Sequence, residues 1–126
     1  MVKKEIKALM IEPGKHPVVV MLNDDLDSLQ KAVSIGADYQ GLIEIISSGN
    51  GDCILCNEEG KLIGLEGNRR VGSDIIAGVF YIMSEGEDGD LVSLSEEKIK
   101  HYTQRFWEPE VLDSAEIEPS VHIWFF

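Results

Sequence analysis

A cluster of polar residues between positions 57 and 70 has the residue types needed to bind a charged ligand. These residues lie in two predicted turns that flank Leu62-Ile63, and the two arginines stand out because basic residues are scarce in this chain. Guanidinium groups hold carboxylates and phosphates through forked hydrogen bonds. The cluster therefore predicts a site for a small anionic ligand, or for an acidic residue of a partner, formed by Asn57, Glu58, Lys61, Asn68, Arg69 and Arg70.

The same cluster also fits a structural role. Polar side chains in turns commonly cap backbone groups, and the basic residues could pair locally with Glu58, Glu59 and Glu66. The two interpretations differ in whether the side chains face a ligand or their own chain.

Cys53 and Cys56 have the C-x-x-C spacing of redox pairs and of zinc sites. A redox pair normally lies at a helix N-terminus that lowers the thiol pKa, but here a turn sequence follows. Residues three apart in a strand face opposite sides of a sheet, and His16, His101 and His122 are too scattered to complete a zinc site. We therefore predict two buried structural cysteines and no bound metal.

The segment at residues 85–90 combines four carboxylates with two glycines. Aligned as a calcium loop beginning at Ser84, it lacks the carboxylates required at positions one, three and twelve, so a solvated acidic turn fits better. We predict that this turn is a surface for a basic protein partner, formed by Glu85, Glu87, Asp88 and Asp90.

The charge balance excludes several classes of function. The 126 residues include 23 acidic and 11 basic ones, for a net charge of −12. Proteins that grip nucleic-acid phosphates or anionic membranes need excess Lys and Arg, so neither partner is expected. Fourteen of the acids lie in three windows without a basic residue, at 24–27, 85–97 and 108–118. They form either one negative face or three solvated segments on different faces.

No catalytic constellation is recognisable in the sequence. It contains no G-x-G-x-x-G that opens a helix, no G-x-x-x-x-G-K-[ST] and no G-x-S-x-G, so the fingerprints of dinucleotide sites, phosphate loops and serine hydrolases are missing. We assign no catalytic residue and expect no cofactor.

Turn signals divide the chain into short strands. Pro13-Gly14 predicts a turn between apolar runs at 6–11 and 18–22, and further strands are expected at 42–46 and 53–56. The nine-residue apolar run at 75–83 predicts a central strand. Gly64, Gly67 and Gly72 predict a loop that contains residues 68–70.

Two amphipathic helices are expected from apolar residues at i, i+3 and i+7. Asn23 or Asp24 is predicted to cap the first helix, which buries Leu26, Leu29 and Val33 and stops at Gly36. Ser95 is predicted to cap the second helix, which buries Ile99, Tyr102 and Phe106 and ends before Pro109.

These elements predict one α+β domain at residues 1–109, with a mostly antiparallel sheet and two amphipathic helices. Residues 110–126 form an acidic tail that ends in an apolar segment, expected to pack on the domain or on a neighbouring subunit; Trp124-Phe125-Phe126 would then support a homo-oligomer. No signal peptide is recognisable, and no apolar run approaches the roughly 20 residues of a membrane span. The protein is expected in the cytoplasm.

Three segments resemble a known family. They are Glu12-Pro13-Gly14-Lys15 with Pro17, Cys56-Asn57-Glu58-Glu59-Gly60-Lys61 with Gly64 and Asn68-Arg69, and Asp74-Ile75-Ile76-Ala77-Gly78 with Phe80. They are similar to the domain-of-unknown-function family 3846 of phages, prophages and mobile elements, mostly of Firmicutes. The resemblance implies a phage or mobile-element origin and a bacterial cytosol, and it brings no catalytic residue with it.

Three functions follow as hypotheses. The first is a non-enzymatic binding protein that antagonises a host defence by occupying a basic protein partner. The second is a sponge for a small anionic nucleotide, held by Lys61, Arg69 and Arg70. The third is a metal-dependent enzyme that uses the acidic residues.

Overall fold

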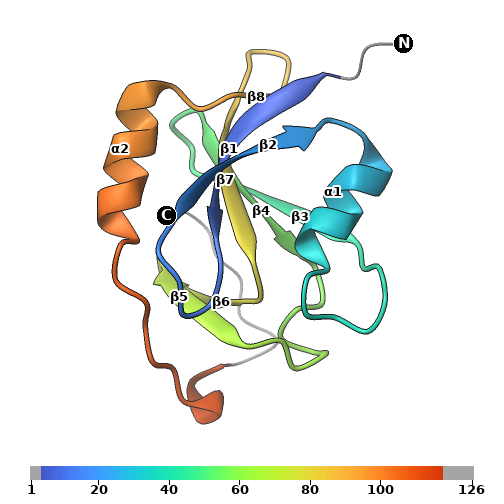
Figure 1. The fold of residues 1–126 in the computed structure, drawn as a ribbon, viewed down its shortest axis with the longest axis vertical. Helices are drawn as coiled ribbons and strands as arrows, with labels where there is room; N and C mark the ends of the chain where they lie inside the picture. The colour runs from blue at the N-terminus through green and yellow to red at the C-terminus, as the bar shows by residue number, and fades with distance from the viewer. Residues whose placement is uncertain (1–3, 118–126) are drawn as a thin grey trace.

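The structure, a computed structural model, describes residues 4–117 and has a six-stranded antiparallel sheet at its centre (Figure 1). The strands follow the order β2-β1-β7-β4-β3, and the short β8 pairs with the end of β7. The predicted α+β class, with a mostly antiparallel sheet and two helices, is confirmed. The strands of this sheet are β1 Glu5–Ile11, β2 Val18–Asn23, β3 Ile43–Ser47, β4 Asp52–Asn57, β7 Phe80–Glu85 and β8 Leu91–Val92.

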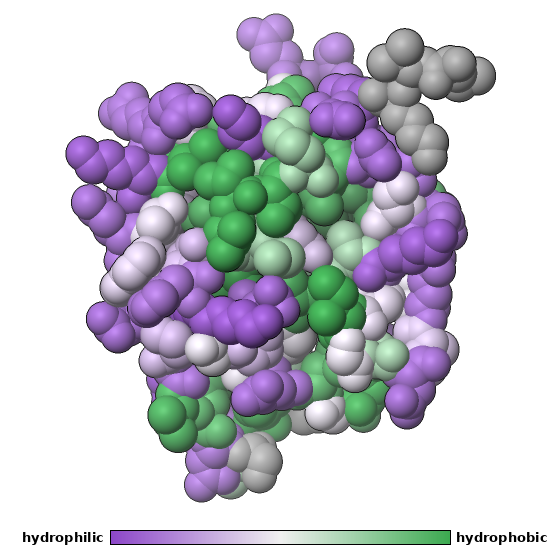
Figure 2. Space-filling view, viewed as in Figure 1, coloured by the Kyte–Doolittle hydropathy of each residue, from purple (hydrophilic) through white to green (hydrophobic). Residues whose placement is uncertain are grey.

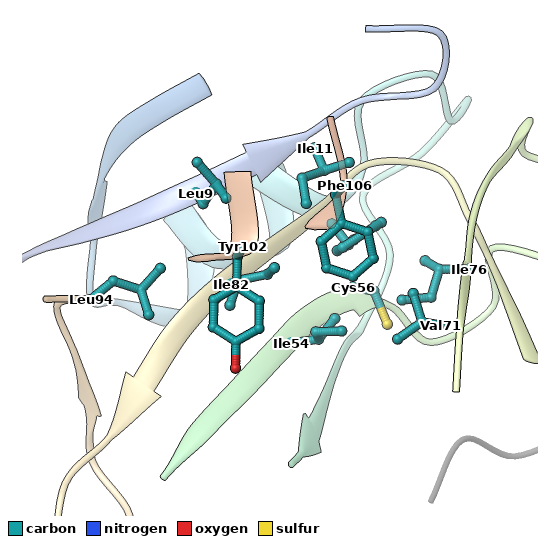
Figure 3. Packing of buried hydrophobic residues seen from close by; sticks show 11 residues of the cluster. Leu9, Ile11, Ile54, Cys56, Val71, Ile76, Ile82, Leu94, Tyr102 and Phe106 are labelled. Atoms are coloured by element: carbon teal, nitrogen blue, oxygen red, sulfur yellow. The ribbon is translucent and has the colours of Figure 1, made fainter. Parts of the chain in front are cut away.

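The two helices contribute to two separate hydrophobic clusters. Leu29 and Val33 of α1 (Leu26–Val33) are buried in one of them. Tyr102 of α2 (Glu96–Arg105) and the neighbouring Phe106 are buried in the other, as Figure 3 shows. Because alternate strand residues point to opposite faces, the central strands contribute side chains to both clusters.

The helix starts depend on single side chains. Asp25 is the N-cap of α1, and its carboxylate accepts a hydrogen bond at 2.8 Å from the backbone N–H of the third helical residue. The predicted caps, Asn23 and Asp24, were therefore wrong by one or two residues. Ser95 caps α2 as predicted, with its Oγ 3.2 Å from the N–H of the third residue. Leu26, predicted to be buried, is 61% exposed.

The predicted single strand at 75–83 is wrong. The run divides into β6 (Asp74–Ala77) and β7, which belong to different sheets, because Gly78 between them adopts a left-handed conformation with φ +85°. Strand β6 pairs with β5 (Gly67–Val71) in a separate two-stranded sheet. The loop predicted for residues 68–70 is therefore also wrong, since these residues form β5.

Residues 110–117, including the short 3₁₀ helix η1 (Ser114–Glu116), follow α2 and pack against β5 (Figure 1). Gly67 at the start of β5 is needed for this contact, because a Cβ there would come within 2.8 Å of Ile117 Cδ1. The apolar end of the predicted tail, and with it the predicted oligomer contact through Trp124-Phe125-Phe126, lies outside the described residues.

The acidic windows do not share one face. The first turn of α1, the β7–β8 turn and the segment after α2 lie at separate places around the molecule in Figure 1. Of the two arrangements that the sequence left open, the structure shows separate acidic segments.

Apolar side chains are also exposed on the surface. Figure 2 shows hydrophobic side chains gathered on the viewed face, with hydrophilic ones around them. The edge strand β2 carries three exposed apolar residues, Val18, Val19 and Met21.

Candidate functional site

Arg69, the central residue of the predicted anion site, is buried in β5 with 1% of its surface exposed. Its Nε and Nη2 donate to Phe106 O at 3.2 and 3.1 Å, and Nη2 also donates to Lys15 O at 2.6 Å. Its Nη1 donates to the backbone O and the side-chain Oδ1 of Asn68 at 3.3 and 2.8 Å. These five bonds match the five N–H donors of a guanidinium, so Arg69 is bonded to the protein's own oxygens.

The position of Arg69 also explains how its charge is stabilised. Phe106 is the C-cap of α2, so the guanidinium lies at the carbonyl end of a helix, where the helix dipole favours a cation. Burial lowers the pKa of Arg69, and the nearby Glu110 carboxylate opposes that shift. Arg69 therefore fastens α2 to the small sheet.

Asn68 and Lys61 connect segments that are far apart in the sequence. The side-chain amide of Asn68 donates to Ile11 O at 2.8 Å and to Gly78 O at 2.9 Å, which joins β1 to the β6–β7 link. Lys61 forms a largely buried ion pair with Asp74 at the start of β6. Asn68 therefore holds the small sheet against β1 of the large one, and Lys61 fastens the β4–β5 loop to β6.

The other predicted ligand residues are dispersed. Asn57 is buried, and its Oδ1 accepts from Glu59 N at 2.9 Å. Glu58 is exposed. Arg70 is exposed as well, and it pairs with Glu110, at 3.6 Å, and with Glu116.

The structure thus does not gather the six predicted ligand residues around one opening. Three of them bind backbone groups, as the structural alternative predicted: Asn57, Asn68 and Arg69. The local pairing predicted with Glu58, Glu59 and Glu66 is not what Lys61 and Arg70 show, because they pair with Asp74, Glu110 and Glu116.

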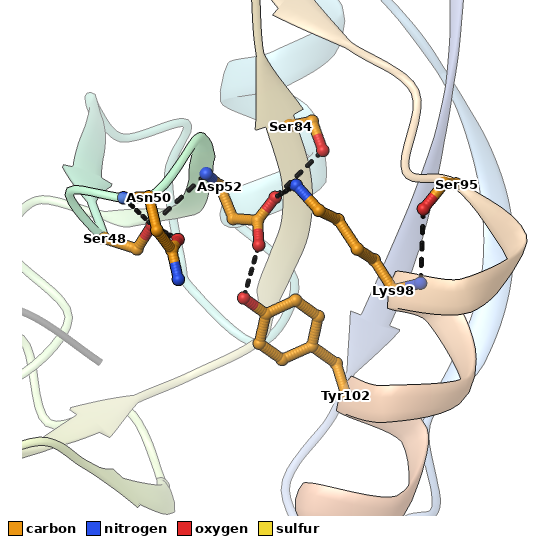
Figure 4. A network of polar contacts seen from close by, with 7 residues as sticks. All are labelled: Ser48, Asn50, Asp52, Ser84, Ser95, Lys98 and Tyr102. Carbon is orange, nitrogen blue, oxygen red and sulfur yellow. Dashed lines mark hydrogen bonds and ion pairs between the residues drawn. The ribbon is translucent and has the colours of Figure 1, made fainter.

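A second polar network, which the sequence did not reveal, surrounds Asp52 (Figure 4). Asp52 is 3% exposed at the start of β4. Its carboxylate accepts from Lys98 Nζ at 2.6 Å, Tyr102 Oη at 2.6 Å and Ser84 Oγ at 3.0 Å. Since Lys98 and Tyr102 are one helical turn apart in α2, the network fastens that helix to β4 and β7.

The surroundings of Asp52 favour its charged form. Burial acts to raise the pKa of Asp52, but the hydrogen bonds from Lys98, Tyr102 and Ser84 outweigh it, and the pKa lies below its ordinary value. Burial raises the pKa of Tyr102, and the bond to Asp52 raises it further. Tyr102 is therefore a hydrogen-bond donor in this network.

The two cysteines are buried and free, as predicted, and they face opposite sides of the sheet. Burial raises the pKa of Cys53 to about 12, with a further contribution from Glu85. Burial also raises the pKa of Cys56, and the neighbouring Glu44 adds to the shift. Thiolates, the reactive form of cysteine, are therefore scarce at neutral pH.

We expect neither thiol of the folded protein to react readily with Ellman's reagent at pH 8. The rate should be at least about 100-fold lower than in urea, because raised pKa values and burial both suppress thiolate attack. Counting the thiols released with time in buffer and in urea measures this. Rapid reaction of one thiol in buffer would contradict the buried placement.

The predicted partner surface lies on the hairpin between β7 and β8. We call residues 86–90 the acidic turn. Gly86 N donates to Asp90 O at 2.7 Å and Gly89 N donates to Gly86 O at 3.0 Å, so the backbone of the turn is fixed. Glu87 and Asp88 are exposed together with Asp90, whereas the carboxylate of Glu85 is half-buried and accepts from Ser47.

A cleft of about 380 Å³ opens at the opposite end of β7. Four connecting segments line it: the β1–β2 turn, the loop after α1, the β4–β5 loop and the β6–β7 link. None of the six residues predicted to bind a ligand is among the lining residues. The lining residues include three acidic ones, Glu12, Asp38 and Glu66, and larger apolar or aromatic ones, Ile35, Tyr39, Ile63, Leu65 and Val79.

The sequence reasoning missed this cleft because its residues come from segments that are distant along the chain. Three glycines with left-handed backbones, Gly36, Gly64 and Gly78, lie in these segments. Leu65 packs directly on Gly78, where a Cβ would come within 2.7 Å of Leu65 Cδ1. The glycines were a usable signal of sharp turns, but not of which turns meet.

Neither a metal-binding cluster nor a membrane-spanning helix is found within residues 4–117. Within residues 4–117, no three His, Cys, Asp or Glu side chains are arranged to hold a metal ion. No helix in this range is long and apolar enough to cross a membrane.

Comparison of the sequence with known protein families assigns the chain to one of them. Residues 6–107 match the family described as Domain of unknown function (DUF3846). The chain belongs to this family. Curated proteins and solved structures gave no match. In this DUF3846 protein, the Asn68, Lys61 and Arg69 contacts join the segments on which the family resemblance rests, since they reach Gly78, Asp74 and Lys15.

Proposed function

We infer that this DUF3846 protein is a small non-enzymatic binding protein whose acidic turn occupies a basic protein partner. The setting we propose, following the family resemblance, is a phage or mobile element in the bacterial cytosol, where occupying the partner antagonises a host defence.

The observation that supports this function is the exposure of the acidic turn on a fixed hairpin. Glu87, Asp88 and Asp90 are exposed, and none of them forms an ion pair with another residue between 4 and 117. By contrast, Asp24 and Asp27 of the first acidic window pair with lysines. Glu110 and Glu116 of the third window pair with Arg70. The turn therefore offers three exposed carboxylates that are available to a partner.

The physics of such a surface favours fast, salt-sensitive association. Clustered like charges steer an oppositely charged partner during encounter, and salt screens that attraction over a Debye length of about 10 Å at 0.1 M. Ordering of the loop costs little on binding, because two backbone hydrogen bonds already fix the turn.

The buried polar groups that could take part in catalysis form hydrogen bonds within the protein instead. This favours a binding function over a catalytic one. Arg69 donates to backbone and amide oxygens, and Asp52 accepts three hydrogen bonds from α2 and β7. Each of these groups holds two elements together.

The test is a pull-down at 50 and 300 mM salt from a lysate of the organism that carries the gene. Glu87→Lys/Asp88→Lys is compared with wild type and with Glu58→Lys/Glu108→Lys, which reverses two exposed charges elsewhere. We expect a basic protein that binds wild type and the control variant, and that loses at least about tenfold in affinity on charge reversal of the turn. Equal binding by the turn variant and the control, or an interaction unaffected by salt, would contradict the proposal.

A further inference from the structure

The cleft at the far end of β7 has the properties of a second binding site. Its volume of about 380 Å³ lies at the small end of the range for ligand sites, roughly 300–1,000 Å³. Its walls are held by backbone hydrogen bonds, from Gly78 N to Glu66 O at 2.7 Å and from Leu65 N to Gly60 O at 2.9 Å. The opening is therefore formed without a ligand.

The charge of the cleft is of one sign. Its lining includes the carboxylates of Glu12, Asp38 and Glu66 and no Lys, Arg or His. Glu12 pairs with Lys15 at 3.4 Å, whereas Asp38 and Glu66 are exposed and form no ion pair within residues 4–117. Two exposed acidic residues of the lining, Asp38 and Glu66, are thus available to a ligand. The carboxylates of the cleft stabilise a bound cation and repel an anion.

The remaining lining is apolar. Val79 is buried at the base, and Ile63 and Leu65 are half-buried. Ile35 and Tyr39 are about half-exposed, at 49% and 52%. An apolar chain fits against such a wall, and a tyrosine ring adds attraction for a cation above its face.

We propose that this cleft binds an ammonium or guanidinium group carried on a short apolar chain. The chain lies against Ile63 and Leu65, and the charged head lies among the carboxylates of Asp38 and Glu66. The ligand is either a free alkylamine or the side chain of a Lys or Arg in a polypeptide. The site does not depend on the acidic turn, which lies at the opposite end of β7.

Three probes of similar shape and different charge test the proposal. Pentylamine, pentanol and pentanoate are titrated into ¹⁵N-labelled protein, and amide shifts are followed by NMR. We expect pentylamine to shift the amides of residues 35–39, 63–66 and 78–79, and to bind at least about fivefold more tightly than pentanol. Pentanoate should bind least. Tighter binding of pentanol or pentanoate, or shifts confined to other regions, would overturn the proposal.

Variants separate charge from shape. Asp38→Asn/Glu66→Gln should weaken pentylamine binding about five- to tenfold and leave pentanol unchanged. Ala37→Phe, which fills the cleft, should abolish binding of both. The matched control Glu87→Gln/Asp88→Asn removes two carboxylates from the acidic turn and should leave pentylamine binding as in wild type. Unchanged pentylamine binding in the Asp38/Glu66 variant would rule out the cation site.

The source of the cation is decided in the same experiment with a capped Gly-Lys-Gly peptide and with cadaverine. A peptide that binds at least as tightly as pentylamine assigns the cleft to a polypeptide side chain, and tighter cadaverine binding assigns it to a free diamine. Because the proposed function is tested with variants of the acidic turn and this proposal with variants of the cleft, failure of one is distinguishable from failure of the other.

Discussion

Arg69→Met is expected to lower the free energy of unfolding by about 3–5 kcal/mol. The methionine keeps much of the buried volume, but Phe106 O and Lys15 O lose their donors in a site with 1% exposure. A buried acceptor left without a partner keeps the full cost of its desolvation. Because small domains are stable by only about 5–15 kcal/mol, much of the stability depends on this one side chain.

Arg70 provides a matched control one residue away. Arg70→Met removes an exposed arginine whose partners, Glu110 and Glu116, are also accessible to water, so the loss should be at most about a third of that for Arg69. Arg69→Lys should fall between the two, because an ammonium keeps the charge but not the forked geometry. Urea denaturation followed by circular dichroism measures all three. Equal losses of unfolding free energy at the two arginines would show that the buried hydrogen bonds of Arg69 stabilise the protein no more than the exposed ion pairs of Arg70.

Asp52→Asn is expected to cost about 2–3 kcal/mol at pH 7. The amide cannot accept from Lys98, Tyr102 and Ser84 as the carboxylate does, and it places N–H groups against a lysine. The amides of α2 should then exchange with deuterium faster than in wild type, because the helix loses its bond to the sheet. Exchange in α1 should remain as it was.

The effect of Asp52 should depend on pH in a defined direction. The pKa of this carboxyl is lowered in the folded protein, so the stability it contributes is complete above its unfolded pKa, about 4, and is lost as pH falls through the folded pKa. The difference between wild type and Asp52→Asn should therefore be largest at neutral pH and shrink below about pH 4. Asp90→Asn, at an exposed turn, should match wild type throughout. A pH-independent difference would contradict the charged, bonded state of Asp52.

Local sequence patterns predicted those elements that have a clear turn signal, or a helix cap and apolar residues spaced along one face. The β1–β2 hairpin followed from Pro13-Gly14, and α2 followed from Ser95 and its apolar spacing. The strand at 75–83 was misread because its apolar run continues through Gly78, and a run of apolar residues does not reveal that one glycine sends it into two sheets.

The candidate site was less predictable for a physical reason. Arginine is usually exposed, so Arg69 in a glycine-rich segment read as a loop residue that faces a ligand. Its burial depends on hydrogen bonds to the carbonyls of Lys15 and Phe106. No local sequence pattern predicts that these distant carbonyls meet the guanidinium. The cleft likewise needs four segments to meet. The acidic turn, by contrast, is continuous in sequence and was predicted as a solvated turn; the structure shows it exposed on the β7–β8 hairpin.

The hydrogen bonds of Arg69 to Lys15 O and Phe106 O, which we call the arginine anchor, affect both the folding and the unfolding rate of the chain. Lys15 and Phe106 lie 54 and 37 residues from Arg69, so both long loops must close before the guanidinium finds its acceptors. We expect these contacts to form after the folding transition state, so that losing them accelerates unfolding more than it slows folding. During synthesis the anchor cannot form until Phe106 has left the ribosome. Resistance to proteases, which attack the opened chain, is therefore expected only after Phe106 has emerged.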